Sequence, residues 1–217
     1  MLSTSLDLNI TTLEDYTIEM MGKCELILLD AFECMINKDL NKVQDIIKRD
    51  DEIDKLREYI RDKSIELMVL RQPMAIDLRR IYSLGHIAIE LERIGDNAVN
   101  IVKEVMSIAN EKYIKESIDL VKIKDICIEM LRGVRQSLET HNENLAYEVA
   151  LKDDLIDRIY EDVKIHTLEV MYKDKTYIDQ GVKLLFIARY LERVGDHITN
   201  TCEKIIYSIK GEMIEIG

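Results

Sequence analysis

Turn-forming residues are scarce in this chain, whose 217 residues include one proline, Pro73, and eight glycines. A β-sandwich or β-barrel needs turn residues about every 8–12 positions, so this composition argues against an all-β domain. The chain also lacks a run of about 20 apolar residues, because charged residues soon interrupt each apolar segment, as at Glu25 and Asp30. We therefore expect no membrane-spanning helix.

Export signals and paired cysteines are missing as well. The first ten residues contain neither the basic region nor the apolar region of a secretory signal. The four cysteines are far apart and form no CxxC pair, which argues against a zinc ribbon; they are Cys24, Cys34, Cys127 and Cys202. Because free cysteine packs as a small hydrophobic residue, we expect buried, reduced thiols in a cytoplasmic protein.

Positive charge is in deficit, with 30 basic and 42 acidic residues and a net charge of −12. Affinity for nucleic acid comes mostly from cationic contacts to phosphate, so we expect no nucleic-acid partner. An acidic surface suits cations and basic patches on other proteins. Charged residues make up 33% and apolar residues 47%, which together favour long amphipathic helices around a substantial core.

Helical periodicity is the main positive feature. Apolar residues recur in alternating steps of three and four, as on the buried face of a helix, from Leu13 to Cys34, from Ile81 to Val102 and from Gly181 to Cys202. Asp39 and Asn142 are candidate N-caps, and Pro73 suits the first turn of a helix. We predict six long helices. Five lie at about 12–36, 39–70, 73–110, 115–140 and 142–173, and the sixth follows a polar connection at 172–177 and carries the stripe from Gly181 to Cys202.

The two halves of the chain also repeat in sequence. Leu91–Asn100 aligns with Leu191–Asn200 at an offset of 100 residues, and Asp50–Asp54 aligns with Asp153–Asp157 at an offset of 103 residues. A period of this length implies the duplication of a domain. We predict an all-α fold of two tandem, pseudo-symmetric three-helix bundles, one at residues 1–112 and one at 113–217.

Four pairs of carboxylates are spaced i, i+4, which places both members on one face of a helix. The pairs are Asp50/Asp54, Glu92/Asp96, Asp153/Asp157 and Glu192/Asp196. Like charges at this spacing destabilise a helix by a few tenths of a kcal/mol (roughly 0.2–0.5), so a cation, an arginine or water should offset the repulsion. If pairs on neighbouring helices face each other, four carboxylates converge in each half and suit iron, manganese, magnesium, calcium or, less well, zinc.

A solvated acidic surface is the alternative explanation for any single pair. Two observations favour a metal site. Asp50 falls in the inward stripe of its helix, among Ile46, Ile47 and Ile53, and both pairs recur at matching places in the two halves. Taken together, these observations favour metal binding over an ordinary charged surface.

Further candidate residues surround the carboxylates. Gly95 and Gly195 lie in mid-helix, where the missing side chain either serves close packing or lets a second helix bring its carboxylates near. Arg93 and Arg193 are expected to pair with an acid, or else to contact an anion near a metal. Four further residues complete this set: Asn100 and Asn200 as ligands or orienting groups, His197 as a weaker ligand candidate, and Asn97 in its place in the first half.

Signatures of several enzyme classes are missing: the sequence has no Glu-x-x-His, HExxH or GxSxG motif and no glycine-rich phosphate loop. It offers no nucleophilic triad and no general acid or base apart from the clustered carboxylates. We therefore expect a protein that is not an enzyme. The alternatives are a metal-dependent phosphohydrolase, in which a carboxylate-bound metal activates water, and a metal-free helical scaffold.

With these motifs, the chain resembles the PhoU family, the accessory and regulatory proteins of bacterial phosphate-specific transport. The resemblance covers nearly the whole chain and is carried by the following segments: Leu91-Glu-Arg-Ile-Gly-Asp96, Leu191-Glu-Arg-Val-Gly-Asp-His197, the aspartate-rich segments 50–54 and 153–157, Arg71–Arg80 and Ile206–Gly211. It implies two pseudo-symmetric three-helix bundles whose E(D)xxxD motifs bind multinuclear metal clusters, with iron or zinc expected and manganese or magnesium as further candidates.

The resemblance also implies the ligand sets and the partners. One metal site would use Asp50, Asp54, Glu92, Asp96 and, less securely, Asn100; the other would use Asp153, Asp157, Glu192, Asp196 and, less securely, Asn200. The protein would repress the phosphate-starvation response by linking an ABC phosphate transporter to a sensor histidine kinase, and would reach the membrane only through these partners. We also expect a homodimer. Lys103 stands opposite Glu203 in the repeat, so the two sites are expected to differ in affinity.

Overall fold

The computed structural model describes residues 5–111, 113–114 and 117–216. Every regular element in this part of the chain is helical. The elements are α1 (Ser5–Asn37), η1 (Leu40–Lys42), α2 (Val43–Arg71), α3 (Ala75–Ile108), α4 (Ser117–Thr140), α5 (Glu143–Ala150), α6 (Asp153–Lys173), η2 (Lys175–Tyr177) and α7 (Ile178–Lys210), where η marks a short 3₁₀ turn. The predicted all-α class is confirmed.

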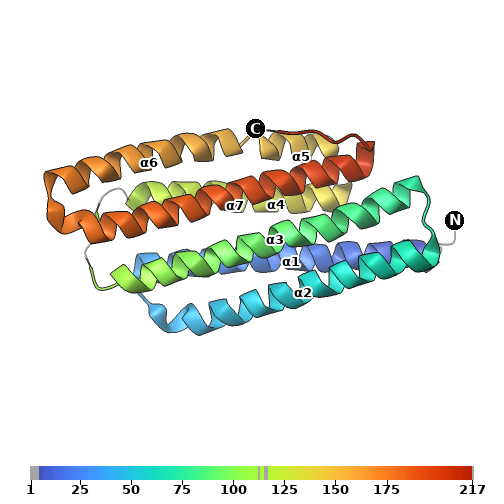
Figure 1. The fold of residues 1–217 in the computed structure, drawn as a ribbon, viewed down its shortest axis with the longest axis horizontal. Coiled ribbons are helices and arrows are strands. Elements are labelled where there is room, and N and C mark those ends of the chain that lie inside the picture. Colours follow the sequence, from blue (N-terminus) through green and yellow to red (C-terminus); the bar gives the residue numbers. More distant parts are fainter. Residues whose placement is uncertain (1–4, 112, 115–116, 217) are drawn as a thin grey trace.

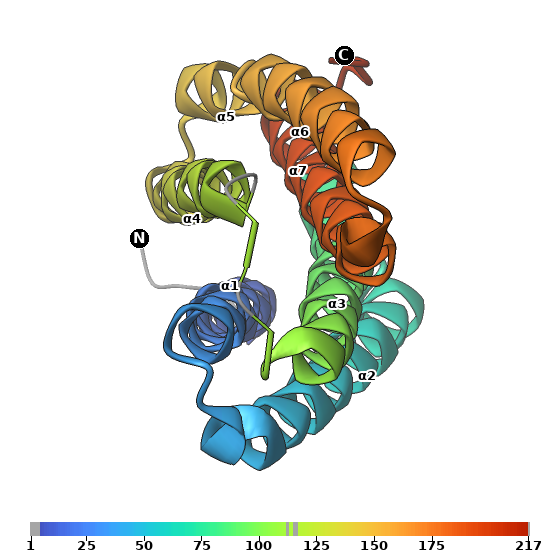
Figure 2. The same ribbon diagram turned by 90° about the vertical axis from the view of Figure 1, so that its left-hand side faces the viewer.

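Two three-helix bundles lie one upon the other (Figures 1 and 2). Helices α1, α2 and α3 form the first bundle, and α4, the pair α5 and α6, and α7 form the second. The long helices α3 and α7 run in opposite directions and make the most extensive contact between helices, while α1 packs on α4. The predicted pseudo-symmetric plan of six helices is confirmed, with α5 and α6 together in the place of α2.

Several helix ends follow directly from the sequence. The Asp39 side chain accepts a hydrogen bond from the backbone N–H of Asn41 at 2.9 Å and caps η1. The side chain of Asn142 accepts from the N–H groups of Asn144 and Leu145 at 3.1 and 3.2 Å and caps α5. Both caps satisfy backbone donors that lack a partner within the helix, as the sequence predicts.

Two predicted boundaries were shifted, and two others cannot be compared with the structure. Helix α1 begins at Ser5 and not near Thr12, because Leu6 and Ile10 extend the apolar stripe onto the core. Pro73 lies two residues before α3, outside its first turn. Lys115, the predicted start of the fourth helix, and Lys112, at the predicted end of the first bundle, lie outside the described residues.

The helix predicted at 142–173 is interrupted by a turn at residues 151–152, which separates α5 from α6. Here the N–H of Lys152 donates to the carbonyl oxygen of Val149 at 3.1 Å, a shorter-range bond than the helix uses. Neither proline nor glycine marks the break, so periodicity alone runs through it. The interruption places Asp153 at the first turn of a new helix.

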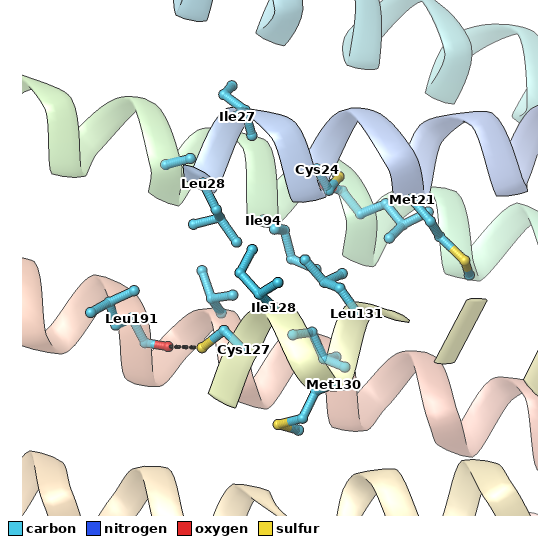
Figure 3. Packing of buried hydrophobic residues seen from close by; sticks show 14 of the residues in the cluster. Met21, Cys24, Ile27, Leu28, Ile94, Cys127, Ile128, Met130, Leu131 and Leu191 are labelled. Atoms are coloured by element: carbon cyan, nitrogen blue, oxygen red, sulfur yellow. Dashed lines mark hydrogen bonds between the residues drawn. The ribbon is translucent and has the colours of Figure 1, made fainter. Parts of the chain in front are cut away.

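A continuous core joins the two bundles. The predicted stripes of α1, α3 and α7 are buried throughout. Figure 3 shows Leu28 of α1 and Ile128 of α4 pointing toward one another across the bundle interface. Ile47 is a correction, since it is 41% exposed and does not belong to the inward stripe.

All four cysteines are buried and free, as predicted. Among the described helices, none combines the length and the apolar composition that crossing a bilayer requires.

Candidate metal centres

The first cluster consists of Asp50 and Asp54 on α2 and Glu92 and Asp96 on α3. Burial and the negative charges of Asp96 and Asp54 raise the pKa of Asp50 to about 6. Burial and the charge of Asp96 also raise the pKa of Glu92, against the positive charges of two arginines. These effects act between carboxylates of α2 and α3, two helices that pack against each other, so the four acids belong to one acidic face of this helix pair.

The second cluster repeats this arrangement with Asp153 and Asp157 on α6 and Glu192 and Asp196 on α7. Burial and the charges of Asp196 and Asp157 raise the pKa of Asp153 to about 7. Burial, followed by the charge of Asp196, likewise raises the pKa values of Asp157 and Glu192. The first cluster therefore lies where α2 packs on α3, and the second lies where α6 packs on α7.

A glycine makes room for each cluster. A Cβ atom on Gly95 would lie 2.7 Å from Oδ1 of Asp50 and 3.3 Å from Cδ1 of Ile53. A Cβ on Gly195 would overlap Oδ1 of Asp153 and lie 2.9 Å from Cδ1 of Ile156. The missing side chain thus lets the neighbouring helix bring its first aspartate against the glycine, as one of the two sequence-based explanations requires.

Arginines offset part of the negative charge. Arg93 lies 3.3 Å from Asp96 and 3.5 Å from Glu92, which confirms its predicted pairing with an acid. Arg57 of α2 reaches Glu92 at 3.7 Å, and Arg189 pairs with the equivalent glutamate of the second cluster. The pair of Arg93 with Asp96 is exposed and contributes only about 0–1 kcal/mol. The pKa values of Glu92 and Glu192 stay raised despite the arginines, so repulsion remains in each cluster.

The two asparagines of the predicted ligand sets make different contacts. Oδ1 of Asn100 accepts a hydrogen bond from Lys103 at 3.3 Å. Nδ2 of Asn200 donates to Oε2 of Glu90 on α3 at 3.1 Å, and the ring nitrogen Nδ1 of His197 lies 2.8 Å from the same oxygen. Although burial acts in the opposite direction, these bonds hold the pKa of Glu90 below its usual range. Glu90 was not predicted, because only the packing of α3 on α7 places it here.

Sequence reasoning also missed residues beneath the clusters. The thiol of Cys24 donates to the carbonyl oxygen of Leu91 at 3.2 Å, and Cys127 donates to that of Leu191 at 3.7 Å (Figure 3). Burial keeps both thiols protonated by raising their pKa values. A signal was present, because Cys24 and Cys127 have the same offset of 103 residues as Asp50 and Asp153.

One hydroxyl distinguishes the second cluster from the first. Oγ1 of Thr199 donates to Oδ2 of Asp153 at 3.2 Å. This hydrogen bond partly offsets the rise in the pKa of Asp153 that burial causes. The equivalent residue of the first repeat is Val99, which has no donor in its side chain. The sequence difference was visible, but the fold was needed to identify the acceptor.

The second cluster contains two buried oxygens without a hydrogen-bond partner, Oδ1 of Asp153 and Oε2 of Glu192. Such groups are rare in folded proteins, and a hard cation is the natural partner of an ionised carboxylate oxygen. In the described part of the chain, no three or more His, Cys, Asp or Glu side chains are already arranged to hold a metal ion. The donor types therefore fit a hard metal, and binding would require rotation of the carboxylate side chains.

Comparison with known proteins identifies the family. The model of the PhoU domain matches residues 17–105 and 120–205, one match in each bundle. This chain belongs to the PhoU family. It is 35% identical over 205 residues to the phosphate-specific transport system accessory protein PhoU homolog of Clostridium acetobutylicum, with 92% of each chain covered. The chain is also 32% identical over 194 residues to the PhoU homolog of Rhizobium meliloti, and the match covers 89% of this chain and 82% of the relative.

Solved PhoU structures share the whole fold. The crystal structure of PhoU from Pseudomonas aeruginosa matches with a TM-score of 0.92 at 26% identity, covering 96% of this chain and 100% of that one. The phosphate transport system regulatory protein PhoU from Streptococcus pneumoniae matches with a TM-score of 0.90 at 26% identity, covering 97% and 100%. These names describe accessory and regulatory proteins and not enzymes, in agreement with the sequence-based expectation for this PhoU protein.

Proposed function

We propose that this PhoU-family protein is a metal-binding regulator of phosphate uptake and homeostasis, and that it represses the phosphate-starvation response when phosphate is abundant. Its family and the names of its relatives support a role in phosphate transport. The observation that carries the metal-binding part is the repeated convergence of four carboxylates, each time with one aspartate against a mid-helix glycine. A purely structural acidic surface gives no reason for this costly arrangement to occur twice.

The proposed ligands are the two carboxylate clusters, with the carbonyl oxygens of Asn100 and Asn200 as additional donors. Iron or zinc is the expected metal, with manganese or magnesium as further candidates. A bound metal supplies positive charge that offsets the repulsion within each cluster. Because the pKa values of Asp50 and Asp153 are raised to about 6 and about 7, metal binding would release protons near neutral pH.

We also propose that the protein acts in the cytoplasm as an adaptor between an ABC phosphate transporter and a sensor histidine kinase, and that it forms a homodimer. Exposed apolar side chains near the two hairpin tips support docking to other proteins. Met74 is 79% exposed between α2 and α3, and Tyr172 is 88% exposed in the last turn of α6. We place the boundary between the two repeats at residues 112 and 113.

A reporter of the phosphate-starvation response tests the regulatory role. In cells that lack the gene, the reporter should stay active in high phosphate, and the wild-type gene should restore repression. A variant with Asp50, Asp54, Glu92 and Asp96 changed to alanine should fail to restore it at equal protein abundance. A reporter that ignores deletion of the gene would contradict the proposed role.

The matched control removes two acids of α2 that lie outside the cluster, Asp45 and Asp62, which are 70% and 69% exposed. This control variant should repress like the wild type. If the cluster variant also represses like the wild type, the carboxylates are not needed for regulation, and a metal-free scaffold explains the protein better.

A further inference from the structure

Glu90 links the first bundle to the second cluster. It lies on α3, two residues before the first-cluster ligand candidate Glu92, yet its Oε2 atom contacts Asn200 at 3.1 Å and His197 at 2.8 Å on α7. Both partners follow the ligand candidate Asp196 on α7, by one and by four residues. The Glu90 and His197 side chains are only 19% and 21% exposed, so the contact lies largely within the α3–α7 interface. One bundle thus holds side chains of the cluster in the other.

The hydrogen bond fixes the direction of the Asn200 amide. An amide group is planar, with its NH₂ donor and its carbonyl acceptor on opposite sides. When Nδ2 of Asn200 donates to Glu90, Oδ1 points away from Glu90. Among the described residues, no hydrogen bond engages this oxygen. Glu90 therefore acts on Asn200 as an outer-shell carboxylate acts on a metal ligand, by holding its orientation.

In the described part of the first repeat, no equivalent contact occurs. Tyr190 takes the place of Glu90 in the other half, and Asn97 takes the place of His197. The Asn97 side chain donates within its own helix, to the carbonyl oxygen of Arg93 at 2.7 Å. The oxygen of Asn100 is occupied by the ammonium group of Lys103. In the first cluster, a positively charged side chain therefore already uses the oxygen that a metal would need.

Other features also separate the two clusters. Among the described residues, the two buried carboxylate oxygens without a partner belong to the second cluster, on Asp153 and Glu192, and so does the hydroxyl of Thr199. The second cluster therefore has more oxygens that are held in place and make no hydrogen bond, and these are available to a metal ion. These contacts favour tighter metal binding at the second cluster. The exchange of Lys103 for Glu203 in the sequence indicates only that the two clusters differ.

We propose that Glu90 is a positioning residue for metal binding in the second repeat, where it holds Asn200 and His197 and makes the second cluster the tighter of the two. The second cluster then depends on the packing of α3 against α7, and the first does not. This inference rests on the metal binding in the proposed function.

Calorimetric titration of the metal-depleted full-length protein with Zn²⁺ tests the inference. Each cluster is read separately: the Asp50→Ala/Asp54→Ala background reports the second cluster, and the Asp153→Ala/Asp157→Ala background reports the first. The second cluster should bind Zn²⁺ more tightly. Glu90→Gln should weaken Zn²⁺ binding at the second cluster by about 10-fold or more and leave the first unchanged.

Glu104→Gln is the matched control, since Glu104 of α3 also pairs across the same interface, with Lys183 of α7 at 3.0 Å. It should leave both affinities unchanged. An equal loss in both clusters, an equal loss in the control, or no loss with Glu90→Gln would overturn the inference.

Asn200→Ala provides a second route if Glu90→Gln proves unstable. It should weaken the second cluster to a similar extent, and adding Glu90→Gln should cause little further loss, because both changes remove one interaction. Additive losses would overturn the positioning role. A wild-type protein that takes up no Zn²⁺ overturns the metal-binding function itself, whereas Zn²⁺ uptake that ignores Glu90 overturns this inference alone.

Discussion

The carboxylate of Asp50 lies directly against Gly95, at a point where a Cβ atom would be only 2.7 Å from Oδ1. The same relationship recurs in the second repeat. Glycine in a helix interior costs about 1 kcal/mol relative to alanine, so helix propensity alone gives no reason for its presence in both long helices. The space it leaves is filled by an acid that the neighbouring carboxylates repel, and this makes the glycine part of the candidate metal centre.

Gly195→Ala should destabilise the protein and weaken metal binding at the second cluster. The new methyl group would overlap Oδ1 of Asp153 and lie 2.9 Å from Cδ1 of Ile156, so two side chains must move. We expect the free energy of unfolding to fall by about 1 kcal/mol or more, as for overpacking elsewhere. Urea denaturation and Zn²⁺ titration measure the two effects.

Gly22→Ala is the control for this substitution. The nearest atom to a Cβ there is Nη1 of Arg135 at 3.9 Å, so the methyl group fits. The control should raise stability by about 0.5–1 kcal/mol through helix propensity and leave metal binding unchanged. Gly195→Ala that stabilises the protein to the same extent would show that the space beside Asp153 is not confined.

Asp153→Asn should stabilise the metal-free protein, increasingly so as the pH rises. The pKa of Asp153 is raised to about 7, above its ordinary value of 3.8, so the folded state binds the proton more tightly than the unfolded state. The stability that this proton provides is present below about pH 4 and lost as the pH rises through 7. The neutral amide avoids this loss, so the stability difference between variant and wild type should grow from pH 4 to pH 8.

Urea denaturation in the presence of a chelator, repeated across this pH range, measures that difference. Asp154→Asn serves as the control, because Asp154 is the exposed neighbour of Asp153. Its stability difference should vary less with pH. A difference for Asp153→Asn that is independent of pH would mean that the carboxyl is not buried among other charges.

Thr199→Val should give the second cluster the residue found in the first. It removes the hydroxyl that donates to Asp153 at 3.2 Å, so the pKa of that carboxyl should rise further. Metal loading of the second cluster should then require a higher pH, and stability should fall by about 0.5–1.5 kcal/mol. Zn²⁺ titration at several pH values follows the shift.

Thr201→Val is the same substitution two residues further on, where the hydroxyl donates to the carbonyl oxygen of His197 at 2.9 Å within the helix. Its pH profile of metal loading should match that of the wild type. If both variants shift the profile equally, the hydroxyl of Thr199 has no specific effect on the cluster.

The helices and the main carboxylates could be predicted because both depend on local periodicity. The stripe from Leu13 to Cys34 is buried as expected, and the repeated i, i+4 spacing identifies acids that the fold brings together. The duplication supplied the decisive argument, since it separates eight acids from the other charged residues of helix surfaces.

What depends on packing between the bundles could not be predicted. Glu90 follows Ile89 on a helix rich in acids, and no local pattern identifies its partners on α7. The turn at residues 151–152, which separates α5 from α6, also lacks a proline or glycine signal. Pro73 shows a smaller limit, since its fixed backbone angle suits the residues before a helix as well as the first turn.

The metal content of untagged protein tests the central claim most directly. The wild type should be compared with two variants, one with Asp50, Asp54, Glu92 and Asp96 changed to alanine and one with Asp153, Asp157, Glu192 and Asp196 changed to alanine. We predict that the wild type retains metal after desalting and that each variant retains only the metal of the other cluster. Equal metal content in all three proteins would contradict the assignment of the two clusters as metal centres.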